Sequence, residues 1–183
     1  SANAHNCITI DDFGPSAGVN NRRIPDFYRS SKVQLKHLIT SDQFQFEVSH
    51  NGYCRIFGDN IIHSRKFILS ENKLVIIDEL KGFKKHNIRT YFHWDPSLKL
   101  IKSDRHLFSI LSKKDNHFNG IFQYIKGLGN ESEIKSSLLS DNYDGLGCYF
   151  PNYGIKRKSS SLVFKQNKKL PIINEFNIEW GIK

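Results

Sequence analysis

The sequence has few cysteines, no methionine and no long apolar run, and these shortages exclude several classes of protein. Its three cysteines, Cys7, Cys54 and Cys148, are far apart and odd in number. With no Cys-x-x-Cys pair, they exclude a zinc finger or a redox motif and argue against a disulfide framework. Apolar runs such as residues 74–77 are far shorter than the ~18 residues that cross a bilayer, so we expect neither a transmembrane segment nor a membrane partner.

Sequence motifs of several common functional classes are also missing. There is no Gly-x-Gly-x-x-Gly or P-loop string, which argues against nucleotide binding by these routes. There is no Gly-x-Ser-x-Gly elbow and no His-Glu-x-x-His string, so neither a serine hydrolase nor a helical zinc protease is indicated. The ribonucleoprotein signature of RNA-binding sheets is absent too, and we expect no nucleic-acid partner.

Basic residues outnumber acidic ones, with 27 Lys and Arg against 18 Asp and Glu and a net charge of +9. Such an excess favours an anionic partner, which is a nucleic acid, an acidic polysaccharide or a membrane surface. The lysines are spread along the chain, however, and the only basic triplet is Lys156-Arg157-Lys158. Ordinary solvated surface charge is the simpler interpretation, so the charge alone does not select a partner.

Alternation of apolar and polar residues dominates the chain and predicts half-buried β-strands. The pattern is clearest at residues 44–48, 88–94 and 176–180, and turn residues separate such stretches at short intervals. We therefore expect residues 1–183 to form a single all-β domain, an antiparallel β-sandwich of two large packed sheets with little helix. The best helical window is residues 131–140, which fits a loop equally well.

Two short turns predict strand pairings. A two-residue turn at 51–52 would place Phe46 opposite Phe57 and Val48 opposite Arg55. The Asn-Gly dipeptide at these positions is typical of a two-residue hairpin turn.

A second two-residue turn, at 71–72, would place Arg65 opposite Asp78, on the face that also carries Phe67 and Ile76. These strands are apolar on both faces, so we expect a central pair that is covered on both sides. An unpaired buried charge costs several kcal/mol, so we expect Arg65 and Asp78 to form a structural ion pair that sets the register of the hairpin.

Two of the eight histidines have neighbours that suggest a specific placement. His5 precedes Asn6 and a short strand-like stretch, and His93 lies in an aromatic stretch that ends at Asp95. For either histidine, packing and hydrogen bonding with its neighbours is the ordinary alternative to a functional role.

Four groups of residues follow one another in a characteristic order. They are Ala4-His5-Asn6 with Asp11-Asp12; Asn51-Gly52-Tyr53 with His63-Ser64-Arg65-Lys66; Leu74 to Gly82 with Tyr91-Phe92-His93 and Asp95-Pro96; and Tyr149 to Gly154. In order and spacing, over residues 4–180, they resemble the C-terminal β-domain of the heparinase II/III-like polysaccharide lyases.

The resemblance implies a plan for the whole protein. The family has an N-terminal α/α toroid followed by an antiparallel β-sandwich, so we expect this chain to be a C-terminal fragment of a longer one that includes the toroid. The family cleaves uronate-containing glycans by β-elimination, in which a base removes the C5 proton and an acid protonates the leaving oxygen. Catalytic Tyr and Asn or His residues come from the toroid, so the fragment alone is expected to be inactive.

The resemblance also implies site residues, partners and a location. His93 and Tyr153 are candidates for substrate binding, and His5 matches one ligand of a His-Asp-His metal site in some members. Zinc takes about four ligands, so we expect no cofactor in this chain and zinc only in the full-length parent. The expected partners are an acidic polysaccharide and the protein's own toroid, in a bacterial periplasm or outside the cell.

Two other functions remain open at this point. A non-catalytic carbohydrate-binding or structural β-sandwich would have the same strand pattern, without ~300 residues of helical sequence upstream. A nucleic-acid-binding β-domain would account for the basic charge, and predicts binding with a steep salt dependence.

Overall fold

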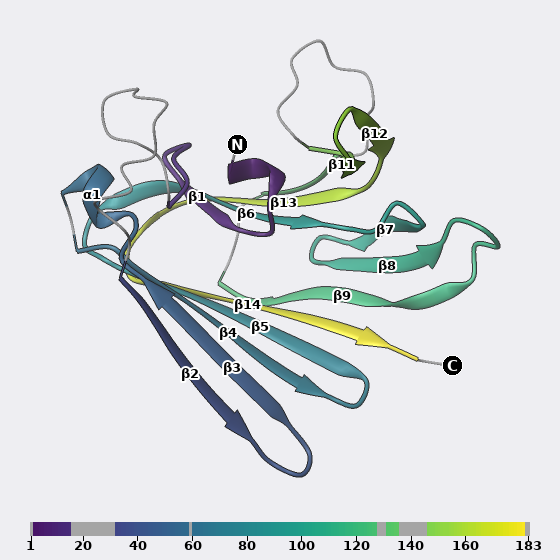
Figure 1. Ribbon diagram of the computed structural model, residues 1–183, viewed down its shortest axis with the longest axis horizontal. Helices are drawn as coiled ribbons and strands as arrows, with labels where there is room; N and C mark the ends of the chain where they lie inside the picture. The colour runs from purple at the N-terminus through teal and green to yellow at the C-terminus, as the bar shows by residue number, and fades with distance from the viewer. Residues whose placement is uncertain (1, 16–31, 59, 128–130, 136–145, 182–183) are drawn as a thin grey trace.

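Figure 1 shows the computed structural model, in which residues 2–15, 32–58, 60–127, 131–135 and 146–181 are described. Antiparallel strands in two packed sheets make up most of this part of the chain. Within these described ranges, helix is limited to the 3-10 turn η1 (Ala2–Ala4) and the short helix α1 (Cys54–Phe57). The expected all-β antiparallel sandwich is confirmed. In the ranges that the structure describes, no helix is long and apolar enough to cross a membrane.

The larger sheet has eight strands in the order β2-β3-β4-β5-β14-β9-β8-β7. Strand β14, the last in the chain, lies between β5 and β9 and so joins two runs of sequential hairpins into one sheet. The strands are β2 (Val33–Ile39), β3 (Phe44–His50), β4 (Ile62–Ser70), β5 (Lys73–Lys81), β7 (Leu98–Asp104), β8 (Leu107–Ser112), β9 (Phe118–Lys126) and β14 (Ile172–Trp180).

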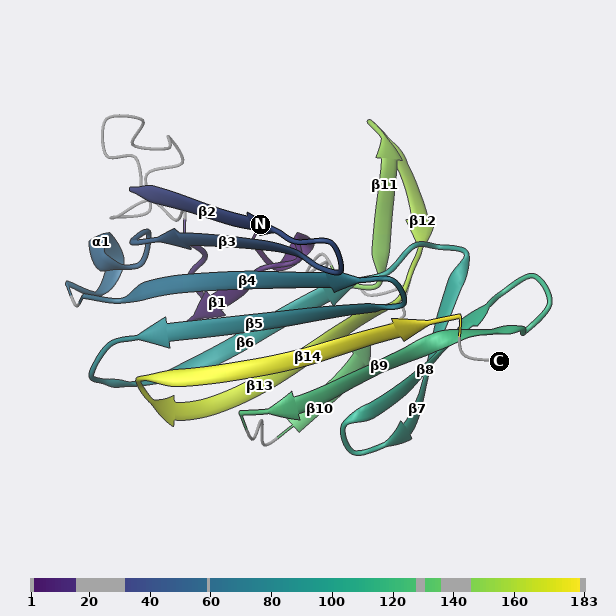
Figure 2. The ribbon, with the colours of Figure 1, turned by 90° about the horizontal axis from the view of Figure 1, so that it is seen from below.

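The smaller sheet has four strands in the order β1-β6-β13-β10, and in Figure 2 it lies behind the larger sheet. These strands are β1 (Ile8–Ile10), β6 (Lys85–His93), β13 (Ser161–Lys169) and β10 (Glu131–Lys135). Strands β11 (Cys148–Asn152) and β12 (Ile155–Lys158) form a separate hairpin that projects away from the sandwich (Figure 2).

An aromatic core joins the two sheets. Phe92 and Phe164 of the smaller sheet pack against Phe108, Phe122 and Phe176 of the larger sheet, and all five are buried. Ring centroids across the interface lie between 4.8 and 6.1 Å apart, mostly at steep interplanar angles. Because alternate residues of a strand point to the same face, the period of two in the sequence delivers these rings to one layer.

The smaller sheet covers only part of the larger one. Strands β4 and β5 are interior strands of the larger sheet, as expected, but they are not covered on both sides: Leu69 is 42% exposed, and β2 is exposed along its whole length. The expectation of two covered faces is therefore wrong. The smaller sheet packs against one face of the larger sheet, so within the described ranges the other face of β4 and β5 has no sheet over it.

The expected hairpin at 51–52 is also wrong. Strand β3 pairs with β4, which places Phe46 opposite Phe67 and Val48 opposite Arg65. The chain between these strands forms α1 instead of a tight turn, because the fully buried Tyr53 draws it toward the core. In the window 131–140, residues 131–135 form strand β10 and not a helix, and the remainder lies outside the described residues.

Candidate functional site

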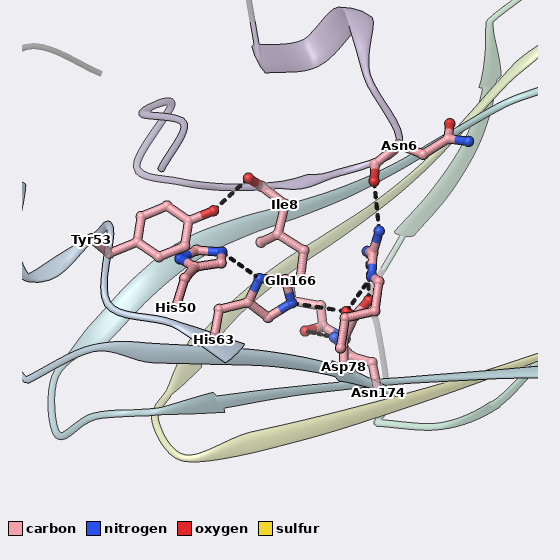
Figure 3. A network of polar contacts seen from close by, with 9 residues as sticks. Asn6, Ile8, His50, Tyr53, His63, Asp78, Gln166 and Asn174 are labelled. Carbon is pink, nitrogen blue, oxygen red and sulfur yellow. Dashed lines mark hydrogen bonds and ion pairs between the residues drawn. The ribbon is translucent and has the colours of Figure 1, made fainter. Parts of the chain in front are cut away.

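The N-terminal segment, residues 2–13, is tied to both sheets. Strand β1 pairs with β6 of the smaller sheet. The hydroxyl of Tyr53, in the chain that follows β3, donates to the carbonyl of Ile8 at 2.6 Å, and the guanidinium of Arg65 donates to the carbonyl of Asn6 at 2.5 Å (Figure 3). The segment that carries His5 and Asn6 is therefore held in a defined position.

A further anchor lies at the Asp11-Asp12 turn. The carboxylate of Asp11 accepts from the backbone N–H of Asn87 at 2.8 Å and lies 2.7 Å from Nδ1 of His86, while Asp12 pairs with Arg89. Both aspartates have positive φ angles, of 47° and 68°, a region that Asp tolerates better than most residues. This landmark of the sequence thus closes the far end of the segment.

Arg65 and Asp78 face each other across β4 and β5, in the register that the 71–72 turn predicts. The guanidinium is bidentate: Nε donates to Oδ1 of Asp78 at 2.7 Å and Nη2 donates to Oδ2 at 2.8 Å. The two side chains are only 12% and 0% exposed. Burial alone would raise the pKa of Asp78, but the charge of Arg65 and hydrogen bonds from His63 and Arg65 lower it to about 2.

Two histidines extend this pair into a chain of hydrogen bonds (Figure 3). The backbone N–H of Gly52 donates to Nδ1 of His50 at 3.2 Å, so the His50 proton is assigned to Nε2. That nitrogen lies 3.2 Å from Nδ1 of His63, and Nε2 of His63 lies 2.9 Å from Oδ1 of Asp78. The chain thus runs from His50 through His63 to Asp78, with each imidazole placed to donate to the next acceptor.

A cavity of about 210 Å³ adjoins this chain and is lined by Cys7, Tyr53 and His50 among others. Burial raises the pKa of the Cys7 thiol to about 11 and also raises the pKa of Tyr53. Burial, with His63 and Arg65, lowers the pKa of His50 to about 4. Cys7, Tyr53 and His50 are therefore neutral at pH 7, while the charged Arg65 also lines the cavity. These three groups are better suited to structure than to nucleophilic chemistry.

The neutral His50 makes the stability of the domain depend on pH. Its pKa is about 4 in the fold against an ordinary value of 6.5, so the unfolded chain binds more protons between these values. The stability contribution is complete above pH 6.5 and is lost as the pH falls toward 4. The free energy of unfolding of the wild type should therefore fall from pH 7 to pH 5. In His50→Gln we expect this fall to be smaller by about 1–2 kcal/mol.

Urea unfolding of both proteins at the two pH values measures this difference. His37→Gln is the matched control, because His37 lies on the exposed strand β2, and it should keep the wild-type pH dependence. Equal pH dependence in wild type and His50→Gln would contradict the assignment.

Asn6 connects the buried pair to one of the expected site residues. Its carbonyl accepts from Arg65, and its side-chain Oδ1 accepts from the backbone N–H of His93 at 2.6 Å. His93 ends β6 half-buried, and its Nδ1 lies 2.9 Å from Oγ of Ser161. His5 precedes β1 with an exposed side chain. The structure thus brings the His5-Asn6 dipeptide and His93 to the same edge of the sandwich.

The described residues do not provide a complete metal site. Nowhere in the ranges that the structure describes do three His, Cys, Asp or Glu side chains gather in a way that could hold an ion. Among the described residues, His5 therefore lacks the further ligands that a zinc ion, which takes about four, would need.

Tyr153, the other expected substrate contact, lies elsewhere. It is fully exposed at the tip of the β11–β12 hairpin, beside Gly154, which takes the positive φ of 78° that the turn requires. The base of this hairpin lies close to His93. The N–H of Gly147 donates to Oγ of Ser161 at 2.8 Å, and this oxygen lies 2.9 Å from Nδ1 of His93. His93 and Tyr153 thus lie on the same side of the domain, His93 at the end of a sandwich strand and Tyr153 at the tip of the projecting hairpin.

Sequence reasoning missed the roles of His50, His63 and Tyr53. His50 and His63 are direct partners in the β3–β4 pairing, so they meet only in that register. The incorrect hairpin at 51–52 hid this relation. The available signal was one histidine on each side of residues 51–62, with Arg65, which also required a partner, two positions after His63.

Comparison with known proteins identifies the family. The family model described as "Heparinase II/III-like, C-terminal" matches residues 1–181. No curated protein matches the sequence. Among solved structures, heparan sulfate lyase HepC from Pedobacter heparinus shares 12% identity at a TM-score of 0.65, and a heparinase III gene product shares 16% at 0.66.

These structures are much longer than the chain. The match covers 99% of the chain and 25% of HepC, and 96% of the chain and 23% of the heparinase III gene product. At these identities the likeness shows the fold, while the family model spans nearly the whole sequence. The chain therefore belongs to the heparinase II/III-like family, as a C-terminal domain of that family.

Proposed function

We propose that this chain is the β-domain of a polysaccharide lyase that cleaves a uronate-containing glycan by β-elimination. The family match supports the reaction class. A net charge of +9 suits an anionic glycan, and the similar structures include a protein named as a heparan sulfate lyase.

One observation carries the proposal: the doubly anchored Asn6. Its backbone is held by the buried Arg65 and its side chain by the backbone of His93. These two contacts hold the exposed His5 and the half-buried His93 at the same edge of the sandwich. Rigid support of this kind is what a substrate-binding edge requires.

The chemistry divides between this domain and a toroid. β-Elimination needs neutralisation of the uronate carboxylate, a base for the C5 proton and an acid for the leaving oxygen. We assign His93 and Tyr153 to substrate binding, and we assign the catalytic Tyr and its Asn or His partner to the toroid. Zinc, where the longer protein holds it, would use His5 and further ligands from outside this chain. The proposed location is the periplasm or the cell exterior.

This division predicts that the purified 183-residue chain forms no product from heparan sulfate or alginate. The full-length protein should form unsaturated uronate ends, which absorb in the ultraviolet. In the full-length protein, His93→Ala should raise KM by about tenfold or more, because it removes a positioned polar contact.

His37→Ala, an exposed histidine on β2, is the matched control and should leave KM unchanged. Product formation by the chain alone would contradict the division of work. Failure of the full-length protein to act on any uronate glycan would reject the lyase itself.

A further inference from the structure

The β11–β12 hairpin has a surface that the sandwich does not explain. We call residues 148–158 the arm; β11 and β12 pair with each other in a sheet of their own, which stands away from the body in Figure 2. Tyr149 and Phe150 are 42% and 48% exposed, and Tyr153 is fully exposed. A lone two-stranded hairpin is marginal in water, and large exposed rings on it commonly mark a contact surface.

The charge of the arm indicates the chemical class of the partner that binds this surface. The basic triplet Lys156-Arg157-Lys158 forms most of β12, and every residue of this strand is exposed. The sequence has no Asp or Glu between Gly145 and Asn174, so the charged residues of the arm itself are all basic. An exposed strand whose charges are all positive is complementary to a polyanion.

The register places cation and ring together. Tyr149 is paired with Arg157, and side chains of a directly paired position lie on the same face of an antiparallel ribbon. A guanidinium can hold a sulfate or carboxylate with two parallel hydrogen bonds, while the neighbouring ring packs against the apolar face of a pyranose. A cation beside an aromatic ring is therefore better suited to bind an anionic polysaccharide than a cation alone.

We propose that the arm is an accessory clamp that binds sulfated or carboxylated sugars of the glycan outside the sugar that reacts. This inference rests on the proposed function. The base of the arm supports it: Ser161 Oγ accepts from Gly147 N–H and lies 2.9 Å from Nδ1 of His93. A chain held on the arm is thereby directed to the edge where His5 and His93 lie.

The test compares two triple variants of this chain. The arm variant carries Tyr153→Ala, Arg157→Gln and Lys158→Gln, and its Kd for heparin oligosaccharides should rise by about tenfold or more. The slope of log Kd against log salt should fall by roughly two units, about one for each cation removed. Circular dichroism and the unfolding midpoint should stay at wild-type values, since the replaced side chains are exposed.

The control variant carries Phe83→Ala, Lys99→Gln and Lys102→Gln. Like the arm variant, it loses one exposed ring and two exposed cations, here two lysines outside the arm, and its Kd should change by less than about twofold. Hyaluronan, which has carboxylates but no sulfates, separates the two anion types: a loss with heparin alone assigns the arm to sulfates, and an equal loss with both assigns it to either anion.

Three results would overturn the clamp. If wild type binds heparin and both variants bind it with the wild-type Kd, the arm is not a clamp, although the proposed function stands. If wild type binds duplex DNA more tightly than heparin through the arm, the partner is a nucleic acid. If wild type binds no glycan, the clamp fails, while the proposed function is decided by the activity of the full-length protein.

Discussion

Replacing Arg65 with alanine is expected to lower the free energy of unfolding by about 3–5 kcal/mol, the range for breaking a buried ion pair. The loss has two sources. Asp78, which is fully buried, keeps its negative charge without its bidentate partner, and the carbonyl of Asn6 loses its donor. Asp78→Ala should cost a similar amount, because the guanidinium then remains in the interior and His63 loses its acceptor.

A double-mutant cycle measures the coupling of the pair. The double variant should cost clearly less than the sum of the two single variants, since removal of both partners leaves no unpaired charge. Lys73 and Glu179 provide the matched control: they too are cross-strand partners in the larger sheet, with Nζ and Oε1 2.9 Å apart, but their side chains are 39% and 40% exposed. Their coupling should lie at about 0.2–1 kcal/mol.

Urea unfolding of the cycle variants at pH 7 gives both coupling energies. An additive Arg65–Asp78 cycle would mean that the pair is not energetically linked. Arg65 would then become a candidate contact of the glycan, since its guanidinium also reaches the segment that carries His5.

The sequence predicted what local physics determines. The 71–72 turn sets the β4–β5 register within twenty residues, and the requirement that a buried Arg and Asp be paired points to the same register. The overall architecture followed in the same way, because alternation assigns a face to each strand before the partner strand is known.

The errors arose where distant segments decide the outcome. Asn51-Gly52 is a good hairpin signal, yet the chain forms α1 there because Tyr53 is buried and reaches the carbonyl of Ile8. That contact joins residues 45 positions apart, which no local pattern reveals. The position of β14 between β5 and β9 is equally non-local, because it pairs the last strand with two strands from earlier, separate parts of the sequence.

The candidate site shows the same division. His5 and His93 stood out in the sequence, but the residue that joins them, Asn6, has its role only through a contact 87 positions away. The His50–His63 chain depends on the β3–β4 register, which the sequence reading placed incorrectly. The candidate site is thus assembled by contacts between segments that are distant in the sequence, and not by a contiguous motif.

Phe122→Ala is expected to lower the free energy of unfolding by about 3–5 kcal/mol, through lost burial and the cavity that remains. Phe122 is fully buried and lies at the centre of the aromatic core. Its ring centroid is 5.1 Å from that of Phe92 and 5.9 Å from that of Phe164, both in the smaller sheet, and 5.9 Å from that of Phe176 in its own sheet. Truncation therefore weakens the contact between the sheets as well as one strand.

Phe83→Ala separates this effect from the general loss of an aromatic ring. Phe83 is 69% exposed, so its truncation should change stability by no more than about 0.5 kcal/mol. Phe122→Leu should fall between the two, because leucine fills most of the space but loses the edge-to-face contacts. If Phe122→Ala unfolded in urea at the same midpoint as Phe83→Ala, the aromatic layer would not be what holds the two sheets together, and the packing described for this domain would be incorrect.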